Sequence, residues 1–452
     1  MKTTFGQRDR NEPAPPPAQP VAAAPVFHEE PVGDSLSILR EQVLKEVDSS
    51  AVGNMPTDVL EHRLEVIIHE IANKDKLELS GGEQARLAKE LANDMTGYGP
   101  LQALLLDDTV NDIMVNGPNK VYVERRGKLE RVAIRFRDNA HIAAVGQKIA
   151  ARIGRRIDEA SPMVDARLPD GSRVNVIIPP LAIDSPCISI RKFPTHHFDI
   201  AGMVANGTIN AGLGKLLEIA ARCRLNILVS GGTGSGKTTL LNALSRFIDH
   251  SERIVTIEDA AELQLQQPHV IRLETRPLSL EGTGLVTQRD LLRNCLRMRP
   301  DRIIVGEVRG EEAFDMLQAM NTGHDGSIST VHANSARDAL SRVENMVQMG
   351  QVNLPLRAIR SQVVSALDLI IQTERMRDGQ RRIVQVTDVC GLEGDVVTLN
   401  DIAFFEYKSE NAQGRLVGSY KSPQAVPKFM DRLTYYGFDR AWKEAVQEVV
   451  VP

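Results

Sequence analysis

The sequence predicts an α/β protein in which a parallel sheet with crossover helices follows a smaller α/β domain. Three observations lead to this fold class. Short apolar runs alternate with helical stretches over residues 213–373, which is typical of a parallel sheet. Residues 98–195 instead carry short alternating strands and turns, with one helix at 139–154. The Gly-rich segment Gly231–Thr238 joins one apolar run to the helix that follows it.

Composition excludes several classes of protein. The chain has 452 residues and a formal net charge of −5, and 25% of its residues are charged. This length favours about three domains, and the composition excludes a wholly disordered chain. No apolar run approaches the roughly 18 residues that a membrane helix needs, so we expect no membrane span. The N-terminus lacks the apolar core of a secretory signal. The mildly acidic charge does not favour a nucleic-acid-binding protein.

The first hundred residues divide into two parts. Residues 1–34 contain seven prolines and little that could build a core, so we predict a disordered, Pro-rich tail. Residues 35–97 predict an acidic three-helix bundle, with seven Lys and Arg against twelve Asp and Glu and a capping box of Ser80 and Glu83. The acidic faces either meet a basic partner or are simply solvated. The apolar faces comprise Leu36, Leu39, Val43 and Val47, then Leu60, Leu64, Ile67 and Ile71, then Leu87 and Leu91.

Three further segments complete the expected organisation. An N-terminal α/β domain covers residues 98–200, a linker covers 201–212, and a second α/β domain covers 213–452. The tail 374–452 carries a hairpin-like pattern and at least one late helix at 430–448. The parallel strands expected in the second domain are 226–230, 253–257, 302–308, 327–331 and 368–372.

The segment Gly231–Thr238 matches the phosphate-binding pattern G-x-x-x-x-G-K-[ST] between a strand and a helix. Its glycines let backbone N–H groups turn toward phosphate oxygens, and the helix N-terminus adds positive partial charge. Lys237 is expected to reach the β- and γ-phosphates, and the Thr238 hydroxyl to ligate Mg²⁺. The residues predicted to bind the nucleotide are Gly232, Thr233, Gly234, Ser235, Gly236, Lys237, Thr238 and Thr239.

Three further polar side chains stand at the ends of predicted strands downstream of this loop. They are Glu258, Glu307 and His332. Ligand sites of open α/β sheets lie at the carboxyl ends of strands, so we expect these residues near the nucleotide. A generic phosphate-binding-loop enzyme has Asp where Gly306 stands, so Glu307 would have to hold the Mg²⁺ shell alone.

These motifs resemble those of the secretion-superfamily ATPases, the hexameric motors of type II and type IV secretion and of type IV pili. The resemblance covers about 98–405. In that family a Gly-Glu pair such as Gly306-Glu307 is normal. The motifs that carry the resemblance, in sequence order, are Gly231–Thr238, Thr256–Asp259, Arg299–Arg309 and Thr330–Asn334. Two N-terminal stretches, Gly97–Leu101 and Ile113–Pro118, resemble specifically the CpaF/TadA branch, which drives tight-adherence (Tad, Flp-type) pili.

The resemblance implies a RecA-like ATPase domain preceded by a PAS-like α/β domain, with ATP and Mg²⁺ as cofactors. It implies that Glu258 is the general base, that Glu307 and Thr238 hold Mg²⁺, and that His332 senses the γ-phosphate. Arginines of the N-terminal domain would reach the nucleotide, because a guanidinium fork suits transition-state charge. The matching arginines are Arg167, Arg173 and Arg191.

The implied function is a cytoplasmic hexamer, peripheral at the inner membrane, that powers pilus assembly through inner-membrane platform proteins. Use of the same motor for retraction stays open. Nucleotide-driven closure between the two α/β domains would supply the motion. No nucleic-acid partner is expected.

Other readings remain. A type IV secretion ATPase fits the same motifs. A type II secretion ATPase is disfavoured because the tetracysteine metal insertion usual in that family is missing here, and the four cysteines of this chain lie at least 36 residues apart. A nucleic-acid translocase would need a basic channel and stacking aromatics. This chain has one Trp and a short basic stretch of Arg152, Arg155 and Arg156. A switch that binds ATP without hydrolysis would lack catalytic carboxylates, and Glu258 and Glu307 argue against it.

Overall fold

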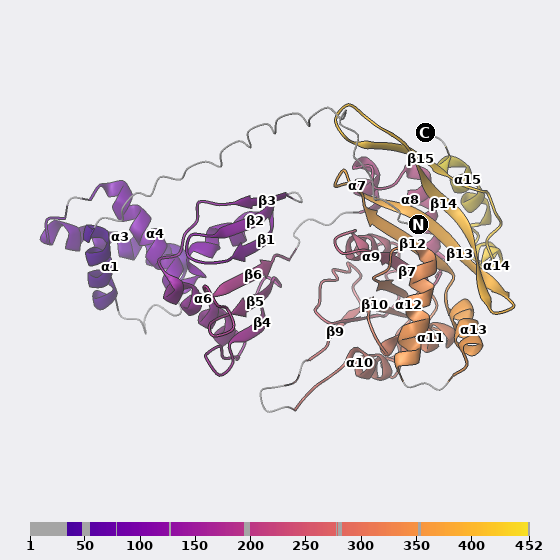
Figure 1. Ribbon diagram of the computed structural model, residues 1–452, viewed down its shortest axis with the longest axis horizontal. Coiled ribbons are helices and arrows are strands. Elements are labelled where there is room, and N and C mark those ends of the chain that lie inside the picture. The colour runs from indigo at the N-terminus through magenta and orange to yellow at the C-terminus, as the bar shows by residue number, and fades with distance from the viewer. Residues whose placement is uncertain are drawn as a thin grey trace, which may run out of the picture. The chain divides into compact units, whose positions relative to one another are not determined.

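A computed structural model of the chain contains two compact units (Figure 1). The structure describes residues 34–47, 55–77, 79–125, 128–193, 199–276, 278, 283–350 and 354–450. The predicted Pro-rich tail lies outside the described residues, apart from its last residue. The first unit comprises residues up to 167 together with 173–191, and the second comprises 168–172 together with 192–452. None of the described helices has the length and hydropathy that a membrane crossing requires.

The described part of residues 35–97 folds into helices around a small apolar core. Ser80 caps the last helix, accepting the Glu83 N–H while the Glu83 carboxylate accepts the Ser80 N–H, so the predicted capping box is present. The buried side chains include Leu39, Leu60 and Leu91. The helices are α1 (Asp34–Glu46), α3 (Thr57–Lys74) and α4 (Gly81–Thr96).

The rest of the first unit is a six-stranded sheet with α6 (Asn139–Arg152) packed on it. The strand order is β3-β2-β1-β6-β5-β4, and every neighbouring pair is antiparallel. A short 3₁₀ turn, η1 (Gly99–Leu101), and α5 (Gln102–Leu106) join the bundle to β1. The strands are β1 (Val110–Val115), β2 (Val121–Arg125), β3 (Lys128–Arg131), β4 (Met163–Arg167), β5 (Arg173–Ile177) and β6 (Cys187–Arg191).

The second unit holds a nine-stranded mixed sheet in the order β15-β14-β13-β12-β7-β11-β10-β8-β9. The six strands from β12 to β9 in this order are parallel, which confirms the predicted α/β class. Five of them correspond to predicted strands, and β9 is additional. They are β7 (Ile227–Gly231), β8 (Ile254–Glu258), β9 (Val270–Glu274), β10 (Arg302–Val308), β11 (Ile328–Val331) and β12 (Leu369–Arg375).

The hairpin-like tail continues this sheet as three antiparallel strands, of which the first two are long (Figure 1). They are β13 (Arg381–Glu393), β14 (Val396–Glu410) and β15 (Leu416–Lys421). The late helical segment expected at 430–448 comprises two helices, α14 (Met430–Tyr435) and α15 (Asp439–Val449). Between them Gly437 adopts φ 76°, a left-handed conformation that ends a helix.

Helices cover both faces of the nine-stranded sheet and give it two apolar cores. One core joins the sheet to α8, α9 and α15, and the other joins it to α11, α12 and α13. The inner parallel strands β7, β8 and β11 are therefore buried on both faces, as their continuous apolar runs require, whereas the edge strand β9 is only partly covered. The helices are α7 (Ile200–Ala205), α8 (Ala211–Arg222), α9 (Lys237–Ser245), α10 (Gln288–Cys295), α11 (Glu312–Asn321), α12 (Ala336–Met349) and α13 (Leu356–Ala366).

The structure differs from the expected linker at 201–212, which is largely helical. Asp199 caps α7 by accepting the N–H of Gly202 at 2.7 Å, and Asn210 caps α8 by accepting the N–H of Leu213 at 2.9 Å. Ile200 and Met203 are buried in the core of the second unit. The three glycines in this stretch suggested a loop, but capping and burial outweigh their low helix propensity.

Candidate functional site

The loop Gly231–Thr238 connects β7 directly to α9 in the second unit. Gly234 and Gly236 adopt φ values of 68° and 98°, which side chains with a Cβ rarely reach. Gly236 precedes the first turn of α9 and offers no side-chain cap, so the N–H groups of that turn have no acceptor from a capping side chain. Such a turn is a ready anion-binding position.

Two donors within the loop converge on the carbonyl oxygen of Gly232. Lys237 Nζ donates to it at 3.0 Å and to the Gly231 carbonyl at 2.9 Å, and the Ser235 N–H donates to it over 3.4 Å. A Cβ built on Gly232 would meet nothing within 4 Å, so this residue has open space around it. A phosphate oxygen placed there would receive the same donors, and the loop therefore fits a nucleotide phosphate.

Burial lowers the pKa of Lys237, and the nearby Glu307 carboxylate opposes that shift. Glu307 thus lies close enough to influence the loop lysine, as a ligand of the Mg²⁺ shell must. Its Oε2 accepts from Arg309 Nη2 at 2.7 Å, and Arg309 Nη1 reaches Asp259 Oδ2 at 3.3 Å. Arg309 therefore connects the ends of β10 and β8. Thr238, the other expected metal ligand, lies in the first turn of α9.

The predicted strand-end residues share one edge of the sheet with the loop. Glu258 is the last residue of β8, Glu307 lies near the end of β10, and His332 follows β11. All three strands run parallel to β7 or to its neighbours, so their carboxyl ends meet where the loop begins. Glu307 and His332 are both partly exposed, whereas Glu258 is buried.

Glu258 is buried away from solvent. Its side chain is 3% exposed, and Oε2 accepts the N–H groups of Glu262 at 2.7 Å and Leu263 at 2.9 Å. Its other oxygen, Oε1, is buried and makes no hydrogen bond to the described residues. Burial raises the pKa of Glu258 in spite of the two backbone hydrogen bonds. A raised pKa suits a group that takes a proton during catalysis.

The packing of Glu258 accounts for the unusual Gly306. A Cβ at position 306 would lie 2.9 Å from Glu258 Cγ, so no larger residue fits while Glu258 stays in place. The Gly306 carbonyl accepts the Thr330 hydroxyl at 2.7 Å, which ties β10 to β11 just before His332. An Asp at position 306, as in a generic enzyme, would therefore compete with Glu258 for the same space.

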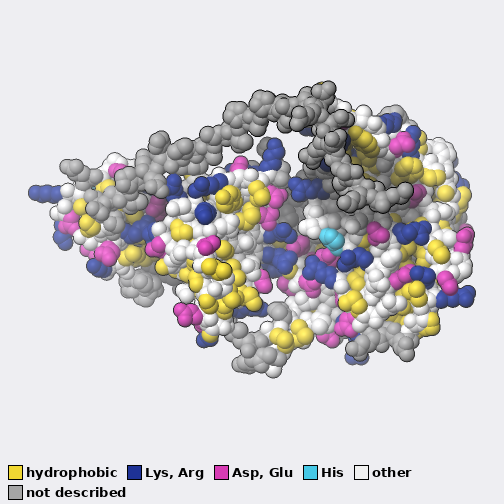
Figure 2. Space-filling view, viewed as in Figure 1, with side chains coloured by type: hydrophobic (Ala, Val, Ile, Leu, Met, Phe, Trp, Pro, Cys, Tyr) yellow, Lys and Arg dark blue, Asp and Glu magenta, His cyan; other side chains and the backbone are white. Residues whose placement is uncertain are grey.

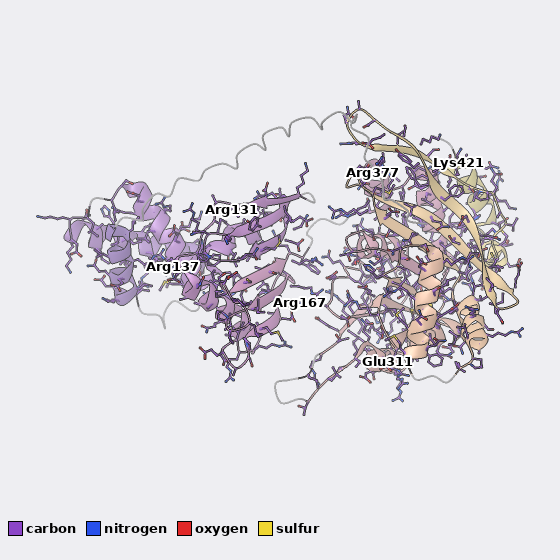
Figure 3. The ribbon with its side chains drawn as sticks, in the orientation of Figure 1. Arg131, Arg137, Arg167, Glu311, Arg377 and Lys421 are labelled. Carbon is purple, nitrogen blue, oxygen red and sulfur yellow. The ribbon has the colours of Figure 1, made fainter. Side chains whose placement is uncertain are left out.

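The three predicted arginines form one row across the sheet of the first unit. Arg167 on β4 lies directly opposite Arg173 on β5, and Arg173 lies opposite Arg191 on β6. Asp112 on β1 lies next in the row and accepts from Arg191 Nε at 3.1 Å. Figure 3 labels Arg167 at the end of β4. The planar guanidinium group matches the geometry of phosphate oxygens, so an arginine of this row could contact an anionic ligand.

Residues on the hairpin between β12 and β13 also contact the loop, and the sequence reasoning missed them. Arg381 Nε donates to the Gly234 carbonyl at 2.8 Å, and the Thr373 hydroxyl lies 2.9 Å from the Ser235 hydroxyl. The strand pattern of residues 368–372 was visible, but nothing in it indicated that this strand would lie beside β7. The contact arises from strand order alone.

A pocket of about 230 Å³ opens beside the loop. Its walls come from the loop, the start of α9, the end of α7 and the hairpin. Gln380 Nε2 closes one side by donating to the Asn206 carbonyl at 2.6 Å. The residues that line it are Met203, Asn206, Thr208, Ser235, Gly236, Thr239, Leu240, Thr373, Gly379, Gln380, Arg381, Arg382 and Ile383. Such a pocket can receive the nucleoside end of a nucleotide whose phosphates lie on the loop.

Comparison with known proteins places this site in a family. The sequence model described as "Type II/IV secretion system protein" matches residues 94–393. The chain belongs to the type II/IV secretion system protein family. It is similar to a Mycobacterium tuberculosis protein named "Putative conjugal transfer protein", with 40% identity over 312 residues, 68% of this chain and 88% of that protein.

Two VirB11 proteins are also similar to this chain. The VirB11 protein of the type IV secretion system of Bartonella henselae is 33% identical over 334 residues, covering 65% of this chain and 92% of its own. The solved VirB11 ATPase of Brucella suis matches with 30% identity and a TM-score of 0.35, over 64% of this chain and 94% of that one.

Membership of the type II/IV secretion system protein family makes this chain an ATP hydrolase that uses ATP with Mg²⁺. The fold is that of the RecA-like secretion ATPases, with a separate N-terminal sheet. The loop donors and Lys237 would bind the phosphates, and Thr238 with Glu307 would hold the Mg²⁺. When bound, Mg²⁺ neutralises charge that develops on the phosphates during phosphoryl transfer.

Proposed function

We propose that this ATPase is the hexameric motor that powers assembly of tight-adherence pili. It would act at the cytoplasmic side of the inner membrane, where platform proteins receive its motion. Glu258 would be the general base, His332 the γ-phosphate sensor, and the arginine row the group that meets the nucleotide of a closed complex. Each round of hydrolysis would then switch the two units between a closed and an open arrangement.

The observation that carries the pilus assignment is the joint between the bundle and the first sheet. The segment Gly97–Leu101, which resembles the CpaF/TadA branch, forms this joint. Tyr98 is 7% exposed and lies under the Arg152 guanidinium at 4.6 Å, and Gly99 adopts φ 59°. A Cβ on Gly99 would lie 2.8 Å from Asp94 Oδ1, so the tight turn needs glycine. The branch motif thus serves to attach a bundle that lies almost wholly outside the family match.

The bundle is firmly attached to α6. The last turn of α4 contains no basic residue of its own. Lys148 Nζ instead donates to the Asp94 carbonyl at 3.0 Å and the Met95 carbonyl at 2.7 Å, and Arg152 Nη2 donates to the Thr96 carbonyl at 2.7 Å. Cations at the C-terminus of a helix satisfy its free carbonyls and its dipole. A bundle held in this way can transmit domain motion to a partner bound on its acidic surface.

A type IV secretion or conjugal transfer motor is the second candidate. It is favoured by the similarity of this chain to conjugal transfer and VirB11 proteins. A nucleic-acid translocase is disfavoured, since basic and acidic side chains are intermixed on the face drawn in Figure 2.

Gene replacement separates the two candidates. A host strain that lacks this gene should lose surface pili and recover them with the wild-type gene but not with Lys237→Ala. Conjugal transfer and protein export by the same strain should stay at wild-type levels. Loss of export or transfer with normal piliation would favour the second candidate. Purified protein should have the mass of a hexamer with Mg-nucleotide, and a monomer under all conditions would contradict the ring.

A further inference from the structure

The hairpin formed by β12 and β13 holds the nucleotide-binding loop at two points. On β12, Thr373 Oγ1 donates to the Ser230 carbonyl at 3.1 Å and shares a hydrogen bond with the Ser235 hydroxyl at 2.9 Å, where both side chains are buried. On β13, Arg381 Nε donates to the Gly234 carbonyl at 2.8 Å. Neither residue belongs to the phosphate-binding motif or to the strand-end set.

The bond from Arg381 determines the direction of one peptide group in the loop. In a trans peptide the carbonyl and the following N–H point to opposite sides. Because the Gly234 carbonyl is turned toward Arg381, the Ser235 N–H is turned the other way. It points to the Gly232 carbonyl, the acceptor that Lys237 Nζ also reaches. A phosphate oxygen at this position would need the same N–H.

The loop needs such a restraint because glycine dominates it. Gly231, Gly232, Gly234 and Gly236 all lie within six residues, and glycine loses more conformational freedom on ordering than any other residue. A Cβ built on Gly236 would lie 3.5 Å from Arg381 Cδ, so the arginine stem also covers the last glycine of the loop. A loop that is ordered before the ligand arrives binds more tightly.

The hairpin itself is rigid enough to serve as a support. At its turn, the Gly379 N–H donates to the Met376 carbonyl at 2.9 Å and the Met376 N–H to the Gln380 carbonyl at 2.8 Å. The carboxylate of Asp378 is nearly buried and accepts the Leu416 N–H at 3.0 Å, which ties the turn to β15. Arg381 therefore extends from a fixed strand end.

We propose that Arg381 is a positioning residue for nucleotide binding, which holds the Gly234 carbonyl outward so that the Ser235 N–H faces the phosphates. The strands β13 to β15 thereby become part of the nucleotide site. This inference rests on ATP hydrolysis by the family. It does not depend on whether the motor serves pilus assembly or type IV secretion. A nucleotide-binding measurement tests it, whereas piliation tests the proposed function, so the two can fail separately.

Arg381→Gln and Arg377→Gln form a matched pair for the test. Both arginines flank the same turn, but Arg377 bonds Glu410 Oε2 at 2.6 Å and Tyr407 Oη at 3.2 Å, away from the loop (Figure 3). Both Arg381 and Gly234 are exposed, so the first substitution leaves no buried group without a partner. Binding of a fluorescent ATP analogue and of ADP, steady-state ATPase kinetics and thermal unfolding without nucleotide are measured for each variant.

Arg381→Gln should weaken ATP and ADP binding roughly tenfold and raise KM similarly, because a hydrogen bond from a charged donor is lost. The kcat at saturating ATP should stay within about twofold, since the ordered loop is restored once nucleotide is bound. Arg381→Lys keeps a charged donor and should bind with intermediate affinity. Arg377→Gln should match the wild type.

Three results would overturn the proposal. Unchanged nucleotide affinity in Arg381→Gln would show that the loop needs no support from the hairpin. A lower kcat with unchanged affinity would show that the guanidinium acts on the transition state instead. A lower unfolding temperature without nucleotide, together with wild-type affinity, would reduce Arg381 to a purely structural residue.

Discussion

Lys237 and Glu258 lie in contrasting surroundings within one site. Lys237 is half-buried and already bonded to two loop carbonyls, so a nucleotide can take over its hydrogen bonds at little cost. Glu258 is dry, and one of its oxygens lacks a hydrogen-bond partner among the described residues. A carboxylate in such a place favours the protonated form. Substitution of either residue should lower ATP turnover, but only substitution of Glu258 should also change how stability depends on pH.

Lys237→Ala should lower ATP turnover roughly a hundredfold or more, because the positive charge that faces the β- and γ-phosphates is lost. The fold should remain, since Lys237 bonds only loop carbonyls. Lys215→Ala is the control, because Lys215 lies at the surface and pairs with Glu448 at 2.7 Å. Release of phosphate measures turnover, and activity equal to that of the control would contradict the assigned phosphate site.

Glu258→Gln should keep nucleotide binding and remove hydrolysis, because the amide cannot take a proton from water. The substitution should leave thermal stability at neutral pH unchanged or raise it. Burial raises the pKa of Glu258, so the ionised carboxylate opposes folding at neutral pH, and the variant should unfold at an equal or higher temperature at pH 7.5. That difference should vanish as the pH falls toward the ordinary glutamate pKa of about 4.3. Wild-type turnover in the variant would exclude Glu258 as the base.

At the scale of single elements, the site depends on how strands place their residues. β8 and β10 are parallel neighbours, which brings Glu258 against Gly306. The sheet of the first unit places three arginines in one row. In both cases the function of a residue depends on the residue on the neighbouring strand.

Gly306→Ala should displace Glu258, because the new Cβ would lie 2.9 Å from its Cγ. We expect a loss of roughly 1–3 kcal/mol in the free energy of unfolding, as for other overpacked cores, together with reduced turnover. Gly391→Ala on β13 is the control, since its Cβ would lie 3.7 Å from Thr398 Oγ1, an ordinary contact. Denaturant unfolding and ATPase assays measure both effects, and identical behaviour of the two variants would refute the steric account.

Alanine at Arg167, Arg173 and Arg191, one at a time, should lower kcat, by roughly tenfold or more where the arginine meets the transferred phosphoryl group. Arg131→Ala on β3 is the control. An unchanged kcat in all three variants would mean that the first unit does not touch the nucleotide.

At the scale of the whole chain, a partly buried hydrogen-bond network joins the bundle to the first sheet. Asp94 on α4 accepts from His141 Nε2 at 3.1 Å, and its other oxygen pairs with Arg137. Burial opposes ionisation of Asp94, but the hydrogen bonds from His141 and Arg137 outweigh it and lower its pKa. The charge of Asp94 therefore stabilises the joint.

Asp94→Asn should destabilise the first unit by roughly 1–3 kcal/mol at neutral pH, because charge-assisted hydrogen bonds are lost. The stabilisation by a lowered pKa is present above the ordinary aspartate pKa of about 3.9 and is lost as the pH falls through the lower folded value. The difference from the wild type should therefore shrink in acid. Glu90→Gln, at an exposed partner of Arg40, is the control. A variant as stable as this control at pH 7 would contradict the role of the network.

Local chemistry in the sequence was enough to predict much of this protein. Short sequence patterns, each spanning a few residues, predicted the loop Gly231–Thr238, the strand-end carboxylates and the capping box at Ser80. The α/β class followed from the alternation of apolar runs with helices. The helix in the expected linker was missed because its capping residues, Asp199 and Asn210, were weighed less than the glycines nearby.

Only the tertiary structure decided which distant residues meet at the site. Arg381 bonds Gly234 across 147 positions in the chain because β12 lies beside β7 and β13 turns back along it. Glu258 fills the space at Gly306 for a similar reason, since β8 and β10 are neighbours. Strand order depends on the packing of both faces of the sheet at once, and no local pattern contains that information. The sequence therefore determined the chemistry of the loop, and the sheet order determined the residues that support it.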